Sequence, residues 1–178
     1  MATTRPIRIA LLILLVLAIP AGIAAENSIS AGVGYNFYRY ETGYLTALSA
    51  TWLQEIQEGL EINLGAEFGI TTDENADGET VPSFLIPVNL GLNFTFPREK
   101  VRYIFGTGLT PVFNFNPETD DEFRFLMGPY LKGAFRLRVH PIMSWYVEYQ
   151  QDLLIGGDDW INAASRITTG INFTLGTE

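Results

Sequence analysis

The sequence predicts an all-β fold: an eight-stranded antiparallel up-and-down transmembrane β-barrel, preceded by a signal peptide. Three observations predict it. Apolar and polar residues alternate with period two along eight segments, the pattern of a half-buried strand. Most of these segments exceed the about 9–11 residues with which a tilted strand crosses a bilayer. The connections between the segments alternate between short ones and longer, acidic ones.

Residues 1–25 have the pattern of a secretory signal peptide. Arg5 and Arg8 supply the positive start, residues 9–19 are apolar, and small residues follow as a cleavage site. The alternative is an uncleaved membrane anchor, but the apolar run is short of the roughly 20 residues that a spanning helix needs. We therefore expect an exported barrel domain over residues 26–178.

Composition excludes several classes of function. The chain of 178 residues has room for one domain and contains no cysteine, which excludes disulfides, thiolate metal sites and a lipid-anchored N-terminus. Its formal net charge is −9, and it becomes −11 without the two arginines of the signal peptide. We expect no nucleic acid partner, because phosphates require Lys and Arg.

The expected strands follow one another with little sequence between them. In the segment 82–96, one face carries large apolar side chains from Phe84 to Phe96, and the other carries residues such as Asn89 and Gly91. The second strand has the weakest pattern, and its apolar face is taken as Tyr44, Leu48, Ala50 and Trp52. The eight strands are expected near residues 28–40, 43–54, 59–71, 82–96, 101–115, 123–138, 142–154 and 164–176.

The apolar face is expected to point outward, into lipid. A soluble barrel would place it inside, but seven large apolar side chains from one strand do not fit an eight-stranded interior. Aromatic residues also recur toward strand ends, as in the interfacial girdles of membrane barrels. Small residues belong where space is short, and the glycines on the opposite face are Gly32, Gly34, Gly65, Gly69, Gly91, Gly106, Gly108, Gly128 and Gly170.

The alternating connections give the barrel a direction. The segments "EIQEG", "PREK" and "VHP" are tight, whereas "TDENADGETV", "NPETDDE" and "GGDDWINAA" are longer and acidic; the first connection, "YETGY", is a short exception. Both termini then lie at the end with the short turns. Bacterial outer-membrane barrels have short periplasmic turns and longer external loops, so both termini are expected to be periplasmic.

The final strand, "TTGINFTLG", resembles the assembly signal of outer-membrane barrels. Gly170, Phe173 and Leu175 fill its key positions, with Leu175 where Phe is commonest. The mature chain resembles small eight-stranded outer-membrane proteins such as the OmpA membrane domain and its OmpX- and OmpW-like relatives. The resemblance implies recognition by the barrel-assembly machinery, and contact with outer-membrane lipids and lipopolysaccharide. We expect a monomer without a cofactor.

The inner face carries charges of both signs, which predicts a plug rather than a wide pore. Centring the "VHP" turn on His140 places Lys132 directly opposite Glu148, and a slip of two residues places it opposite Gln150 or Tyr146 instead. The expected interior charges are Glu61, Glu67, Arg102, Arg124, Lys132, Arg136, Arg138, Glu148, Asp152 and Arg166.

Three functions remain open. The preferred one is a structural or interaction barrel without catalysis, the alternative is a narrow solute or ion channel, and the least favoured is a lipid A modifying enzyme. The enzyme hypothesis rests on His140, Ser144 and Glu148, which share a strand face. A histidine before Pro141 in a tight turn is more simply a solvated turn residue.

An acidic loop provides one further candidate site. Asp73, Asn75 and Asp77 occupy alternate positions of a calcium-loop pattern, but the twelfth position, which needs a bidentate Glu, is Phe84. This excludes an EF-hand. Loose binding of a divalent cation at the rim remains the alternative to a solvated acidic loop.

Overall fold

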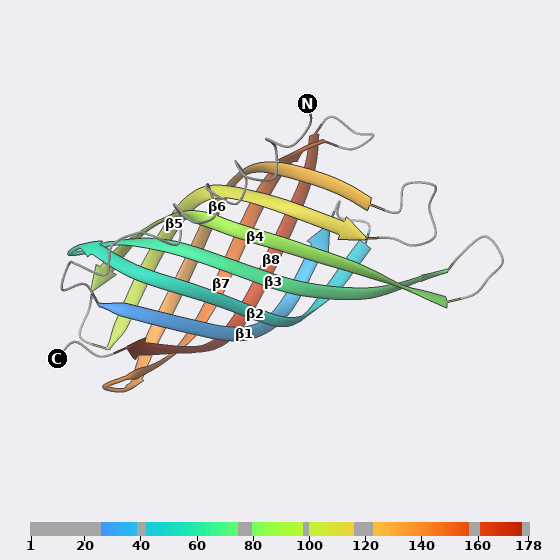
Figure 1. The fold of residues 1–178 in the computed structure, drawn as a ribbon. Coiled ribbons are helices and arrows are strands. Elements are labelled where there is room, and N and C mark those ends of the chain that lie inside the picture. Colours follow the sequence, from blue (N-terminus) through green and yellow to red (C-terminus); the bar gives the residue numbers. More distant parts are fainter. Residues whose placement is uncertain are drawn as a thin grey trace, which may run out of the picture.

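The computed structural model describes residues 26–38, 42–74, 80–97, 100–115, 123–156 and 161–175. Each strand pairs with its neighbours in chain order, and the last pairs with the first to close the barrel (Figure 1). This confirms the predicted eight-stranded antiparallel architecture. The strands are β1 (Asn27–Tyr38), β2 (Thr42–Gln57), β3 (Leu60–Glu74), β4 (Thr80–Pro97), β5 (Val101–Phe115), β6 (Phe123–His140), β7 (Met143–Ile155) and β8 (Ile161–Leu175).

No helix within these ranges is long and apolar enough to cross a membrane.

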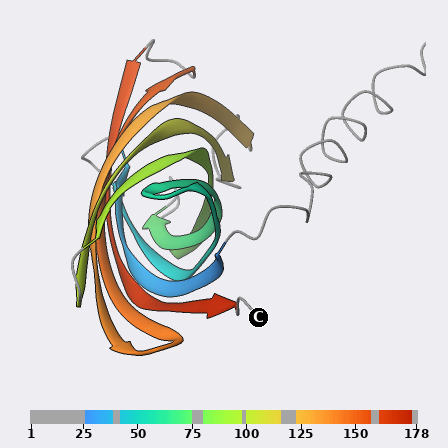
Figure 2. The same cartoon turned by 90° about the vertical axis from the view of Figure 1, so that its left-hand side faces the viewer.

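Closure between β1 and β8 removes the free edges of the sheet. Their ladder runs from Asn27↔Leu175 to Tyr38↔Ala164 without a break in register. Figure 2 looks into the barrel and shows the strands as a continuous ring. Every strand therefore has a partner on both sides, which is the condition for a β-structure in hydrocarbon.

The two ends of the barrel differ, and we name them by their connections. The short-turn end holds the connections at 58–59, 98–100 and 141–142, together with the start of β1 and the end of β8. Gly59 has a φ of 78° in the first of these turns, and its N–H donates to Glu55 Oε1 at 3.2 Å. The long-loop end holds the other four connections, most of which lie outside the described residues, as does the expected signal peptide.

The β3–β4 hairpin is longer than the sequence predicts. The sequence predicts that the acidic loop begins after Thr71, but the ladder continues through Asp73↔Val81 to Glu74↔Thr80. Threonine and valine favour extended strands, and Thr72, Thr80 and Val81 supply them here. The hairpin projects beyond the wall at the long-loop end (Figure 1).

The prediction that Tyr44 faces outward is wrong, because β2 contains a β-bulge. Its pairing with β1 shifts by one residue between Gly34↔Thr46 and Gly32↔Ser49. One extra residue in a strand reverses the faces of all residues before it. Tyr44 therefore points into the barrel and is buried, whereas Leu48, after the bulge, faces outward as predicted.

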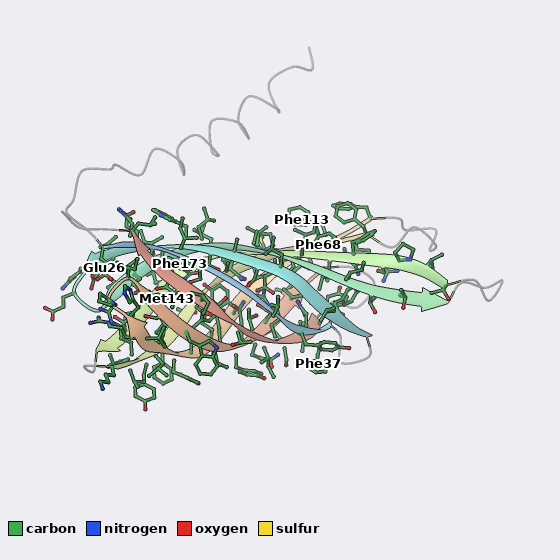
Figure 3. The ribbon with its side chains drawn as sticks, turned by 90° about the horizontal axis from the view of Figure 1, so that it is seen from below. Glu26, Phe37, Phe68, Phe113, Met143 and Phe173 are labelled. Atoms are coloured by element: carbon green, nitrogen blue, oxygen red, sulfur yellow. The ribbon has the colours of Figure 1, made fainter. Side chains whose placement is uncertain are left out.

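The remaining strands confirm the predicted faces. Large apolar side chains are exposed along the outside, including Leu90 at 43% and Leu131 at 69%, while the inner face buries mostly polar residues. Aromatic side chains gather toward both ends of the outer wall: Phe68 stacks on Phe84 at one end, and Phe135 meets Trp145 edge-on at the other. Figure 3 shows Phe68 and Phe113 projecting from the wall.

Three prolines interrupt the wall without changing its register. Pro87 lies in a gap of the β3–β4 ladder, Pro111 in a gap of the β4–β5 ladder, and Pro129 in a gap of the β6–β7 ladder. Proline has no amide hydrogen, so it cannot donate to the facing strand. The flanking pairs keep the same register on both sides of each gap.

Candidate functional site in the barrel lumen

The lumen is filled by three layers of side chains. Along β6, from the short-turn end, they are represented by Arg138, Lys132 and Leu126. The mouth layer consists of Glu26, Glu55, Lys100, Arg102 and Arg138. The ion-pair layer consists of Glu61, Glu67, Lys132, Arg136, Glu148, Asp152 and Arg166. The apolar layer consists of Tyr38, Tyr44, Leu85, Val112, Leu126, Leu154 and Ala164.

Arg166 is the centre of the ion-pair layer and is only 2% exposed. Its Nε and Nη2 donate to the two carboxylate oxygens of Asp152 at 2.9 and 3.0 Å. Its Nη1 donates to Glu67 Oε1 at 2.8 Å, and Nη2 also reaches Asn89 Oδ1 at 2.7 Å. The planar guanidinium suits such forked recognition, and here it joins β8 to β3, β4 and β7.

Neutral side chains complete the surroundings of Arg166. Gln150 Nε2 donates to Asp152 Oδ1 at 2.7 Å and to Asn89 Oδ1 at 3.1 Å. Thr110 Oγ1 lies 2.9 Å from the same Asn89 oxygen and 3.0 Å from Asp152 Oδ1. The charges are thus held in a hydrogen-bonded network, which is the condition under which buried charge is tolerated.

A second pair lies closer to the short-turn end. Arg136 Nη1 and Nη2 donate to the two oxygens of Glu61 at 2.9 and 3.0 Å. A chain of neutral groups extends from it: Asn93 donates to Glu61 at 3.4 Å, Asn63 donates to Asn93 at 3.0 Å, and the Tyr130 hydroxyl donates to Asn63 at 3.0 Å. This chain connects β6, β3 and β4 across the lumen.

The Lys132–Glu148 ion pair forms in the alternative register, the slip of two residues, and not in the register centred on His140. Lys132 lies opposite Gln150, so centring the turn on His140 is wrong. Pro141 and Ile142 instead form the turn, so that His140 pairs with Met143, and an irregularity next to this pair shifts the register. Lys132 Nζ still reaches Glu148 Oε2 at 3.0 Å, because diagonal neighbours on one face are within reach of long side chains.

Inner-face glycines make room for the largest lumen side chains. A Cβ added to Gly106 would lie 2.7 Å from Cε and Cγ of Lys132, its partner on β6. A Cβ on Gly32 would collide with the Tyr146 hydroxyl. The predicted concentration of glycine inside the barrel therefore has a packing cause.

The other expected interior charges lie nearer the two ends. Arg102 is half-buried in the mouth layer, with Nη2 3.9 Å from Glu26 Oε2, and Arg138 is exposed beside it. Arg124 is half-buried at the long-loop end, opposite Asn114 on β5. These three residues are not part of the hydrogen-bonded centre.

The remaining candidate residues are those of the acidic rim and those of the assembly signal in the final strand. Asp73 belongs to the β3–β4 ladder, whereas Asn75 and Asp77 fall outside the described residues. Gly170 faces the lumen, next to the β1 backbone. Phe173 and Leu175, the apolar positions of the same strand, face outward.

The three residues of the enzyme hypothesis do not form a catalytic group. His140 is exposed beside the turn, and Ser144 lines the mouth of the barrel. Glu148 is bound to Lys132 in the ion-pair layer, farther from the turn. Ser144 and Glu148 are four positions apart on β7, which separates them by about 13 Å. Within the described ranges, no three or more His, Cys, Asp or Glu residues are grouped so as to hold a metal ion.

Sequence reasoning missed the apolar layer. Leu85, Val112, Leu126 and Leu154 each occupy a position of the polar inner face, near the long-loop end of its strand. Each stands among mostly polar or small residues on the inner face of its own strand, and only the register brings the four together. The signal was an apolar residue at the same relative height on β4, β5, β6 and β7.

Comparison with known proteins shows the fold. No protein-family model matches the chain, and no curated protein matches it significantly. Solved structures do match. Neisserial surface protein A superposes with a TM-score of 0.65 at 9% identity, covering 86% of this chain and 98% of that one. The outer membrane protein OprG from Pseudomonas aeruginosa gives 0.61 at 8% identity, with coverages of 85% and 96%.

A third match is Ail, the attachment invasion locus protein of Yersinia pestis, solved in complex with the heparin analogue sucrose octasulfate. It gives a TM-score of 0.55 at 10% identity, covering 85% of this chain and 97% of Ail. The chain has the fold of small outer-membrane β-barrels. This confirms the resemblance inferred from the strand pattern and the final strand. At sequence identities of 8–10%, the similarity to these proteins is one of fold.

Proposed function

We propose that this protein is an integral barrel of the bacterial outer membrane, with a structural or interaction role and a sealed, non-catalytic interior. The observation that carries the proposal is the filling of the lumen. An ion-pair layer and an apolar layer follow one another along the barrel axis, and from this filling we expect no continuous path for water or a solute. The working surfaces are then the outer wall and the long-loop end.

The outer wall supports the membrane location. Soluble monomers rarely expose contiguous apolar patches larger than a few hundred Å², whereas here every strand exposes large apolar side chains. The short-turn end would face the periplasm, where the barrel-assembly machinery reads Gly170, Phe173 and Leu175. The closed wall leaves no edge for a partner strand, which supports a monomer surrounded by outer-membrane lipid and lipopolysaccharide.

The long-loop end would carry the interactions. Its connections are acidic in sequence, for example at Asp120, Asp121 and Glu122. Ail was solved with a sulfated heparin analogue, but an acidic rim repels such a polyanion, so we expect this chain to bind neutral or basic partners. The alternative is that Asp73, Asn75 and Asp77 bind the divalent cations that bridge lipopolysaccharide.

A narrow channel is the second candidate, and one observation favours it. In the ion pair between Lys132 and Glu148, the carboxylate side chain is 21% exposed, the highest value among the partners of the ion-pair layer. Breaking this pair would loosen the ion-pair layer at its most exposed member, although the pairs of Arg136 and Arg166 would remain. A conducting path would require the apolar layer to open as well.

Single-channel recording in planar bilayers separates the two candidates. We expect no conductance from the wild type, nor from Lys132→Ala or Glu148→Ala, because the apolar layer remains in place. Steady conductance of the wild type would favour the channel. Conductance only in the two variants would show that the ion pair alone is the gate, contrary to the sealed-lumen proposal.

Catalysis is tested separately. Mass spectrometry of lipid A from cells with and without the protein should give identical species. A change that depends on the protein, and that is lost in Ser144→Ala, would establish the lipid A modifying activity instead.

A further inference from the structure

Four cationic side chains lie together at the short-turn mouth of the lumen. Arg102 on β5 is directly opposite Arg136 on β6. One step closer to the turns, the Arg138 amide donates to the Lys100 carbonyl at 2.8 Å, which brings the backbones of these two residues together. All four residues line the same recess. We call Lys100, Arg102, Arg136 and Arg138 the basic block.

The basic block places like charges next to one another on the inner face of two paired strands. The Cβ atoms of directly opposed residues are about 4.5–5.5 Å apart, and like charges in such positions destabilise a sheet. Anions that lie between the cations remove this repulsion. The carboxylates of the mouth are the anions that the chain itself supplies.

These carboxylates neutralise two members of the basic block. Glu61 accepts from Arg136 with both of its oxygens, at 2.9 and 3.0 Å. Glu26 Oε2 lies 3.9 Å from Arg102 Nη2. Within the described part of the chain, the other two members, Lys100 and Arg138, have no carboxylate within 4.0 Å. Both are exposed, so a ligand can reach them from outside the barrel.

The third carboxylate of the mouth lies on another strand. Glu55 is on β2, where its Oε1 accepts from the amide of Gly59 at 3.2 Å. The recess is thus lined by four positive and three negative side chains. The excess positive charge lies at Lys100 and Arg138. Ser144 on β7 is directly opposite Arg138 and adds a hydroxyl to the same part of the lining.

We propose that Lys100 and Arg138 bind one phosphate group at the entrance of this recess, with the hydroxyl of Ser144 as a neutral donor. A guanidinium matches phosphate with two parallel N–H groups, and a lysine ammonium contributes a compact charge on a flexible stem. The enclosed part of the recess is about 20 Å³, little more than the about 10–15 Å³ that holds one water molecule. The phosphate therefore lies at the entrance and not deep in the lumen.

The phosphate can belong to a phospholipid headgroup or to free phosphate. The level of the site in the wall favours the lipid. Leu137, next to Arg138, is paired with Trp145, which meets Phe135 edge-on at this end of the outer wall. Interfacial aromatic residues lie at the level of the headgroups. The lipid source rests on the membrane location proposed above, whereas the binding of free phosphate does not.

Isothermal titration calorimetry with inorganic phosphate tests the site in the purified barrel. In nonionic detergent at constant ionic strength, we expect a saturable heat with one phosphate per barrel. Lys100→Gln combined with Arg138→Gln should abolish it, and Arg138→Gln alone should weaken binding at least several-fold. Arg124→Gln removes the same charge at the long-loop end and should bind phosphate as the wild type does.

Glu55→Gln provides a test with the opposite sign. It keeps the shape of the side chain and removes a negative charge from the lining of the recess. Because less negative charge then opposes the phosphate, we expect binding to become several-fold tighter. A loss of binding in this variant would contradict an electrostatic site at the mouth.

Native mass spectrometry distinguishes the two sources of the phosphate. The barrel is incubated in nonionic detergent with phosphatidylethanolamine, or with a diacylglycerol that has the same acyl chains and no phosphate. If the source is the lipid, the wild type retains one phospholipid and no diacylglycerol, and the double variant retains neither. Calorimetric binding of inorganic phosphate without retained phospholipid assigns the site to free phosphate.

Three results would overturn the proposal. One is a wild type that neither binds inorganic phosphate nor retains the phospholipid. Another is equal binding by Arg138→Gln and Arg124→Gln, and the third is equal retention of phospholipid and diacylglycerol. None of these results bears on the membrane location, which depends on the outer wall.

Discussion

Arg166→Leu removes the residue that joins the most strands across the lumen. The substitution leaves the carboxylates of Asp152 and Glu67 without their cation, in a region where Arg166 itself is 2% exposed. Removing one partner of a buried pair costs about 3–5 kcal/mol, and we expect a loss of this size. Arg136→Leu leaves only the carboxylate of Glu61 without its cation, and Glu61 borders the mouth layer at the short-turn end. We expect a loss of about 1–3 kcal/mol there.

The measurement is reversible urea unfolding of the barrel in lipid vesicles, followed by the fluorescence of its three tryptophans. Arg166→Leu combined with Asp152→Leu should cost less than the sum of the two single substitutions, because the coupling of contacting residues reaches about 0.5–3 kcal/mol. If Arg166→Leu costs no more than Arg136→Leu, and the cycle shows no coupling, the ion-pair layer does not hold the barrel as argued.

Two further comparisons use matched positions on the wall. Leu90→Arg near mid-wall should cost about 2–4 kcal/mol, whereas Phe96→Arg on the same strand near the short-turn end should cost about 0–1 kcal/mol; equal costs in a vesicle unfolding assay would contradict the membrane depth assigned to the wall. Gly106→Ala should destabilise the barrel by about 1–3 kcal/mol, because its Cβ overlaps Lys132. A Cβ added at Gly133 meets no atom within 4 Å, so Gly133→Ala should be close to neutral. Equal melting temperatures of the two variants would argue against tight packing in the lumen.

The wall was predictable because a two-residue period is a local property. The side chains around Leu90 and Leu131 alternate strictly, and the structure places them outward as the period requires. Tyr44 was assigned to the wrong face because a β-bulge adds one residue to β2. The bulge depends on backbone hydrogen bonds between neighbouring strands, and the local sequence period does not contain that information.

The candidate site was predictable in composition but not in its connections. The inner position of Lys132 follows from the period, whereas its opposition to Gln150 depends on the conformation of one turn. The five-strand arrangement around Arg166 requires the registers of several ladders at once. The apolar layer was missed for the same reason, since Leu126 and Leu154 meet only when their strands are aligned.

The prolines of the wall bear on how this barrel could be re-engineered. The gap at Pro111 includes the facing residues Asn89 and Thr110, and the gap at Pro87 includes Glu67. These are the side chains that Arg166 binds from across the lumen. Where the backbone ladder lacks a donor, hydrogen bonds from Arg166 in the lumen connect the same strands. Removing the lumen side chains to obtain a nanopore would therefore also weaken the contacts between the strands at the proline gaps. The prolines would have to be replaced first.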